Sequence, residues 1–346
     1  MSPEIFSERH TCIFVGAGCS KALFDVPIQS QLVSDFLSWD NRNNGRPHLS
    51  SRLRRLLGAI NDIELIASHY HNLAYPKDAS RNRGLVREFL LLRVALAQYL
   101  DDAVRSRLQA CASSSEDLLR GFLRSRNFKM SDFFIVSTNY DFVLENVLEG
   151  IFGNGSCWYP GVSKQPKADA IPVFKLHGSI NWMEDRGPIS QDGFVRSGKP
   201  VLIAAPSEME LRQSSGDHGY FFERANAKHT PIIVPFIFQK DAWLKEDNLD
   251  WKRIFNATWS LAEHLMKRCT RLLFWGYSLP AADYHMFSLL IQVLDRQDAS
   301  FEIVDKGSGM TNMIRVGELF HERATVSRQG LSSYLQGENS PPAAGA

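Results

Sequence analysis

The chain has 346 residues, 44% hydrophobic and 22% charged, a composition typical of a globular protein. Its 39 Lys and Arg residues balance 38 Asp and Glu residues, so charge gives no case for nucleic acid as a direct partner. Five scattered cysteines without a CxxC pair exclude a zinc ribbon and favour reduced thiols. With no apolar run of membrane-spanning length and no signal-peptide pattern, we expect a cytoplasmic protein without membrane contacts.

Short apolar runs that end in polar or glycine residues recur along the chain and are typical of buried parallel strands. We expect strands at Cys12–Val15, Phe133–Ser137, Val173–Leu176, Val201–Ala204, Ile232–Pro235, Leu272–Trp275 and Phe301–Val304. Helical patterns separate many of them, notably at Asp250–Lys267 and Ala281–Leu294. This alternation predicts an α/β fold with a Rossmann-like, doubly wound, mainly parallel sheet.

A helical pattern occupies about residues 30–130, between the first two strands, with apolar residues three and four positions apart. We interpret it as a helical insertion, or small helical domain, packed on the sheet and lacking a zinc module. The length suits one large domain with an insertion or two unequal domains. We favour a single domain over residues 1–336, and we expect the Pro-, Gly- and Ala-rich tail 337–346 to be disordered.

The first strand ends in the stretch "GAGCS", in which Gly16 and Gly18 precede an expected helix with Ser20 as its N-cap. Glycines there let the backbone approach a pyrophosphate, and a helix N-terminus favours anions. The dinucleotide fingerprint of dehydrogenases needs a third glycine where this chain has Lys21. A tight strand–helix turn without any ligand would have the same sequence.

Two later loops carry residues suited to catalysis. Asn139 and Asp141 follow the second strand with a spacing that lets both face one cleft, or they cap the next helix. His177 follows the third strand, where an imidazole would be a suitable base at neutral pH, although most lone histidines are simply satisfied by a hydrogen bond.

Two further loops carry residues suited to nucleotide binding. Gly276, Tyr277 and Ser278 end another strand ahead of Pro280, which is expected to open a helix. Asp305 ends the last strand and suits a ribose hydroxyl or an adenine edge, or a helix cap. Because the carboxyl ends of parallel strands meet at one edge of a sheet, the five loops together predict a single ligand site.

Four of these loops, read in order, resemble the motifs of the sirtuin-like (silent information regulator-like) superfamily, and more narrowly its NAD-hydrolysing bacterial antiphage-defence effectors. The motifs are Gly-Ala-Gly-Cys-Ser, Thr-Asn-Tyr-Asp, Leu-His-Gly-Ser and Gly-Tyr-Ser-Leu-Pro-x-x-Asp. Deacylase sirtuins also carry a four-cysteine zinc module and a Pro-Asp-Phe-Arg segment. This chain has no such quartet and has "FDVPIQSQL" in that region, which argues against deacylation and leaves NAD+ cleavage as the shared chemistry.

The resemblance implies roles for individual residues. Asn139 would orient the nicotinamide ribose or a water, Asp141 would hold the nicotinamide half, and His177 would be the general base. The residues implied to contact the diphosphate are Gly16, Ala17, Gly18 and Ser20, and those implied to contact the adenosine half are Gly276, Ser278 and Asp305. Four more residues of the same motifs are implied to contact NAD+: Cys19, Thr138, Tyr277 and Asp283. NAD+ would be the substrate, and no metal is expected.

The implied activity is an NAD+ glycohydrolase that releases nicotinamide and ADP-ribose and depletes NAD+ in an abortive antiphage response. One alternative is an NAD-dependent protein deacylase or ADP-ribosyltransferase, and another is a non-catalytic NAD or ADP-ribose sensor in a defence complex. The resemblance also implies a homo-oligomer and a separately encoded partner, either a HerA-type ATPase or a short Argonaute-like protein. The sequence itself contains no P-loop and no nucleic-acid module.

Overall fold

The structure is a computed structural model of the chain. It describes residues 9–42, 49–74, 83–162, 170–185, 200–201, 229–233, 249–280, 283–294, 296, 298–306, 311–319 and 322–337. The tail that the sequence predicts to be disordered lies outside these residues, apart from Gly337.

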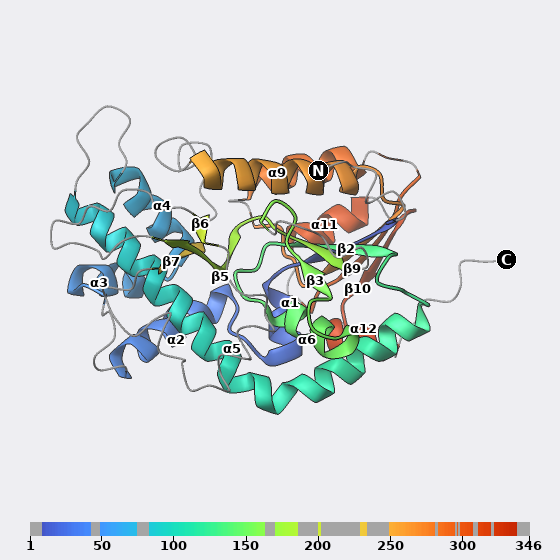
Figure 1. Cartoon of the computed structure of the whole chain (residues 1–346), viewed down its shortest axis with the longest axis horizontal. Coiled ribbons are helices and arrows are strands. Elements are labelled where there is room, and N and C mark those ends of the chain that lie inside the picture. Colours follow the sequence, from blue (N-terminus) through green and yellow to red (C-terminus); the bar gives the residue numbers. More distant parts are fainter. Residues whose placement is uncertain are drawn as a thin grey trace.

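A seven-stranded sheet forms the centre of the molecule (Figure 1). Its strand order is β10-β9-β8-β1-β2-β4-β3, and all of its pairings are parallel. The strands are β1 (Thr11–Val15), β2 (Phe133–Ser137), β3 (Cys157–Trp158), β4 (Ile171–Lys175), β8 (Arg271–Trp275), β9 (Ser300–Val304) and β10 (Ala324–Ser327). The chain extends the sheet from β1 to one side and later returns to the other, so the strand order reverses beside β1.

Helices cover both faces of this sheet, because alternate residues of each strand point to opposite sides. Ile13 and Ile135 belong to one apolar cluster and Phe14 and Phe134 to the other. The first cluster includes residues of α1 (Ala17–Phe24), α5 (Arg83–Ser125), α6 (Val143–Phe152) and α12 (Leu331–Gln336), and the second residues of α9 (Leu249–Met266), α10 (Tyr284–Leu294) and α11 (Asn312–Leu319). The predicted doubly wound α/β fold is confirmed.

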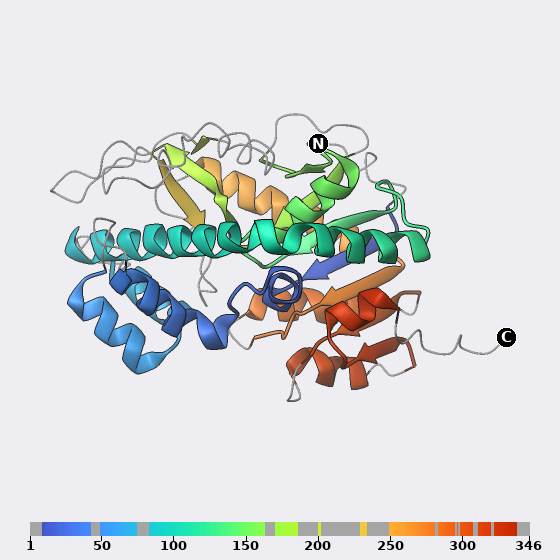
Figure 2. The same ribbon diagram turned by 90° about the horizontal axis from the view of Figure 1, so that it is seen from below.

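The predicted helices between the first two strands are present as α2 (Gln29–Arg42), α3 (Ser51–Ile60), α4 (Ile63–Ala74) and the 43-residue α5. Figure 2 shows α5 running along the molecule, with the shorter helices against one end of it. Farther along, α5 contacts α1, α6 and α12, so it joins the helical insertion to the sheet. None of the helices in the described ranges is long and apolar enough to cross a membrane.

A second, three-stranded sheet corrects two strand predictions. In it β5 (Gly178–Asp185) pairs antiparallel with β6 (Pro200–Val201) and with β7 (His229–Ile233). The runs Val201–Ala204 and Ile232–Pro235 were expected in the parallel sheet, and this is wrong for their described parts. Residues 202–204 and 234–235 lie outside the described residues.

The expected helix after Pro280 begins later than the sequence predicts. The helix α10 begins at Tyr284 rather than at Ala281, and positions 281–282 lie outside the described residues. Before it, the Asp283 N–H donates to the Pro280 carbonyl (2.9 Å). Pro280 therefore lies ahead of the helix and is not its first residue.

Candidate functional site

The loops after the central strands are tied together at the carboxyl edge of the sheet. The Gly16 N–H donates to the Trp275 carbonyl (3.0 Å), and the Gly276 N–H donates to the Val304 carbonyl (2.9 Å). Similar main-chain bonds follow the ends of β2 and β9. The polar residues that the sequence places after β1, β2, β8 and β9 are thereby fixed beside one another.

Three glycines let the loop after β1 touch the loop after β8. The Gly18 N–H donates to the Gly276 carbonyl (3.0 Å). A Cβ on Gly16 would stand 2.6 Å from the Gly276 oxygen, and one on Gly276, whose φ is +60°, would stand 2.4 Å from the Gly18 carbonyl carbon. Close approach of two backbones therefore requires these glycines, and this requirement holds whether or not a phosphate binds.

The helix α1 begins at Ala17, with Gly16 as its N-cap residue. The prediction that Ser20 is the N-cap is wrong, because Ser20 lies inside the helix. Its hydroxyl donates to Asp141 Oδ1 (2.8 Å) and accepts from Asn139 Nδ2 (3.0 Å). Ser20 thus connects α1 to the loop after β2.

Asn139 and Asp141 are held in place on several sides. Asn139 Nδ2 also donates to the Gly16 carbonyl (3.0 Å), and Asp141 Oδ1 also accepts from the Val143 N–H at the start of α6 (3.1 Å). The two residues are 8% and 7% exposed. Asp141 therefore both supports the α6 N-terminus and joins the Ser20–Asn139 network. The N-cap residue of α6 is Phe142, so the alternative that Asn139 and Asp141 cap this helix holds only for the bond from Val143 to Asp141.

A cavity of about 420 Å³ opens at this edge of the sheet. Most of the predicted site residues line it: Ala17, Gly18, Ser20, Thr138, Asn139, Asp141, Gly276, Tyr277, Ser278 and Asp305. Tyr140, Pro280 and Thr311 add to this side, and the Thr311 hydroxyl donates to Asp305 Oδ2 (3.0 Å). The cavity brings together loops from four strands of the sheet.

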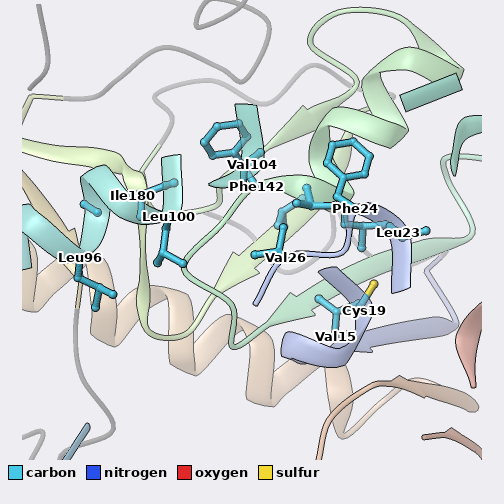
Figure 3. Close-up of a cluster of buried hydrophobic side chains, with 14 of the residues drawn as sticks. Val15, Cys19, Leu23, Phe24, Val26, Leu96, Leu100, Val104, Phe142 and Ile180 are labelled. Atoms are coloured by element: carbon cyan, nitrogen blue, oxygen red, sulfur yellow. The ribbon is translucent and has the colours of Figure 1, made fainter. Parts of the chain in front are cut away.

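The opposite wall of the cavity is apolar and was not predicted. It consists of Val26, Pro27, Ile28, Leu32, Ile63 and Leu100. Figure 3 shows Val26 and Leu100 within one cluster of buried side chains that also contains Val15 and Cys19. The apolar residues of "FDVPIQSQL" were the available signal, whereas Ile63 and Leu100 could not be assigned to the site from their helical pattern.

The remaining predicted residues, Gly16, Cys19, His177 and Asp283, are buried and do not belong to this lining. Burial raises the pKa of the Cys19 thiol, and the nearby Asp141 carboxylate raises it further. The Nε2 atom of His177 lies 3.4 Å from Asp283 Oδ2, and neither side chain is exposed to solvent.

Residues of β4 and β5 also hold the loop that carries Asn139 and Asp141. Lys175 is fully buried; its Nζ donates to the Asp141 carbonyl and lies 3.1 Å from Glu145 Oε1. The Ile180 N–H donates to the Tyr140 carbonyl (2.9 Å). Sequence reasoning missed Lys175, because a single lysine in an apolar strand gives no sign of its partners.

The described part of the chain contains no group of three or more His, Cys, Asp or Glu side chains placed to hold a metal ion. No protein-family model and no curated protein matches the sequence. Among the solved structures similar to the chain is one described as "The Structural basis of Sirtuin Substrate Affinity", with 15% identity, coverage of 96% of this chain and 94% of that chain, and a TM-score of 0.43. A likeness this distant bears on neither the site nor its substrate.

Proposed function

We propose that the chain binds NAD+ in the cavity at the sheet edge and hydrolyses its N-glycosidic bond. The observation that carries this proposal is the network of Ser20, Asn139 and Asp141 on the cavity wall, beside the point where the strand order reverses. Open α/β sheets bind nucleotides at such reversal points. The order of the four sequence motifs is the reason for proposing NAD+ rather than another nucleotide.

The volume and lining of the cavity suit a ligand that has both polar groups and a flat apolar part. Its volume of about 420 Å³ lies within the roughly 300–1,000 Å³ common for ligand pockets. The polar side offers hydroxyl, amide and carboxylate groups to riboses and phosphates. The apolar wall, which includes Val26, Ile63 and Leu100, offers a surface for a flat ring.

The proposed reaction requires oriented polar groups more than it requires a strong acid. The bond between the ribose C1′ and the nicotinamide nitrogen breaks, its electron pair leaves with neutral nicotinamide, and a water oxygen bonds to C1′ as one proton is released. Positioned dipoles around the reacting carbon stabilise such a change. Asn139 and Asp141 are the groups that we assign to this task, because their neighbours fix their orientation.

A specific observation favours a second candidate, a sensor that binds NAD+ or ADP-ribose without turnover. His177, the residue assigned as general base, is 0% exposed and does not line the cavity. A general base contributes roughly 10²–10⁴-fold only when it reaches the proton it removes. Tight binding of NAD+ without nicotinamide release would favour the sensor.

The test is nicotinamide release from NAD+ by the purified full chain, measured by chromatography, together with NAD+ binding measured by calorimetry. Asn139→Ala should lower release at least about 100-fold, the scale expected when one oriented polar group of the site is lost. Asn146→Ala, on α6 and outside the cavity lining, is the matched control and should turn over NAD+ like the wild type.

The outcomes separate the candidates. Wild-type turnover by Asn139→Ala would contradict the site, and absence of NAD+ binding would contradict the proposal as a whole. An acetyl-lysine peptide included in a parallel reaction reports the deacylase alternative. If deacetylated peptide forms only in the presence of NAD+, the chain is an NAD-dependent deacylase that transfers the acetyl group, and the proposal of simple NAD+ hydrolysis is contradicted.

We also propose that NAD+ depletion serves antiphage defence and that turnover is gated. An unregulated NAD+ hydrolase would be toxic to its own cell, so activity should depend on homo-oligomerisation or on a partner such as a HerA-type ATPase or a short Argonaute-like protein. Nicotinamide release measured alongside particle size, with and without each partner, tests this. Full activity of the isolated monomer would contradict gating.

A further inference from the structure

Asp283 lies between two residues of the candidate site. Its Oδ2 atom accepts a hydrogen bond from the Tyr277 hydroxyl (2.9 Å) and stands 3.4 Å from His177 Nε2. Tyr277 lines the cavity, whereas Asp283 is 1% exposed and does not. Asp283 is also held through its main chain, since its N–H donates to the Pro280 carbonyl.

Two aromatic rings lie near His177. The ring of Tyr140 lies 6.5 Å away at an interplanar angle of 73°, and that of Trp259 lies 6.3 Å away at 84°. Trp259 is anchored in turn, because its Nε1 donates to the Leu176 carbonyl (3.1 Å). Asp283 thus stands next to one identified nitrogen of an imidazole whose ring is in contact with two aromatic side chains.

We propose that Asp283 is a positioning residue that orients His177 and Tyr277, and that it does not contact NAD+ itself. This assignment rests on the proposed function. A carboxylate beside Nε2 favours the imidazole tautomer with its hydrogen on Nε2, which makes Nδ1 the nitrogen that accepts a proton. The same negative charge would stabilise the imidazolium if His177 takes up the proton that hydrolysis releases.

Two physical arguments support the assignment. An isolated buried carboxylate is costly, and the hydroxyl of Tyr277 and the imidazole of His177 are the polar groups that offset this cost. Burial raises the pKa of Tyr277, and the Asp283 charge raises it further. The phenol therefore keeps its proton and remains a donor to Asp283.

The kinetic test compares Asp283→Asn, His177→Gln and the double variant in nicotinamide release. Asp283→Asn should lower kcat at least about ten-fold with KM changed less than two-fold, since the residue does not bind substrate. Because part of the effect of Asp283 acts through His177, the loss of kcat in the double variant should be smaller than the product of the two single losses. Losses that multiply in the double variant would overturn the proposal, as would unchanged kcat in Asp283→Asn.

A matched control separates positioning from general destabilisation. Asp40 is also a buried carboxylate, 1% exposed, and pairs with Arg54 (2.7 Å) among the helices of the insertion. Asp40→Asn should lower the unfolding temperature without a selective loss of kcat in the protein that remains folded. A loss of kcat equal to that of Asp283→Asn would overturn the proposal.

A second readout does not depend on turnover or on a folded Asp283 variant. In wild-type protein with 15N-labelled histidine, the signals of His177, assigned by their loss in His177→Gln, should show the form protonated at Nε2. The form protonated only at Nδ1 would overturn the positioning role. The Nε2 form in a chain that does not hydrolyse NAD+ would keep the positioning role and refute the proposed function.

Discussion

The replacement Gly276→Ala tests why the motif after β1 is rich in glycine. Gly276 has a φ of +60°, and a Cβ there would stand 2.4 Å from the Gly18 carbonyl carbon and 2.5 Å from the Cys19 nitrogen. Both atoms belong to the backbone, so no side-chain rotation can relieve the overlap. The two loops would have to move apart and lose the bond from Gly18 to Gly276.

The expected cost follows from two contributions. A non-glycine residue in the left-handed region costs about 1–2 kcal/mol, and overpacking a close contact costs about 1–3 kcal/mol more. Gly337→Ala is the matched control, because Gly337 has a φ of +75° at the end of α12 with no atom within 4 Å of its added Cβ. It should cost only the first contribution.

Urea unfolding of both variants without NAD+ measures the difference, and calorimetry measures NAD+ affinity in parallel. We expect Gly276→Ala to lose about 1–3 kcal/mol more of the unfolding free energy than Gly337→Ala. If Gly276→Ala is as stable as Gly337→Ala but no longer binds NAD+, the glycine serves approach of a ligand, and the explanation by loop packing is refuted.

Two further predictions concern buried charges. Burial raises the pKa of Glu302, but bonds from Tyr334 and an arginine outweigh burial and hold the pKa below 4.5. Ionised Glu302 therefore stabilises the fold above about pH 4.5, and this stabilisation is lost as the pH falls. In Glu302→Gln the free energy of urea unfolding should therefore fall less steeply between neutral and acid pH, the acid limb of the profile. An unchanged limb would contradict this. Lys175→Met leaves Glu145 without its buried cation and should lower the free energy of unfolding by about 3–5 kcal/mol. The control Lys267→Met removes the cation of an exposed pair and should lower it by less than about 1 kcal/mol.

The central sheet could be predicted because parallel strands covered on both faces are continuous apolar runs. The runs around Phe134 and Phe274 have this character, and every residue of β1 and β2 is buried. The runs near Val201 and Ile232 are equally apolar, yet they pair antiparallel elsewhere. A few apolar residues specify burial but not the direction of the neighbouring strand. The strand β10 was missed because three of its four residues are only partly buried and the fourth, Thr325, is exposed.

The candidate site could be predicted as far as its loops. Strand ends identify which residues reach the carboxyl edge of a sheet, so Asn139 and Asp141 were found by position alone. Their supports could not be found, because Lys175 and Ser20 act through partners more than 30 residues away in the sequence. The burial of His177 was equally hidden, since it depends on side chains from three other segments.

The helical insertion belongs to the candidate site and is not only a cover for the sheet. Ile63 and Leu100 form part of the cavity wall and also belong to the apolar cluster that contains Val15 and Cys19 at the sheet edge. Close packing within one cluster fixes the spacing between its members. Packing of the core therefore sets the distance between the apolar wall and the polar loops. The helix α5 connects the two, because it contacts α2 and α4 of the insertion and also α1 and α6 beside the sheet.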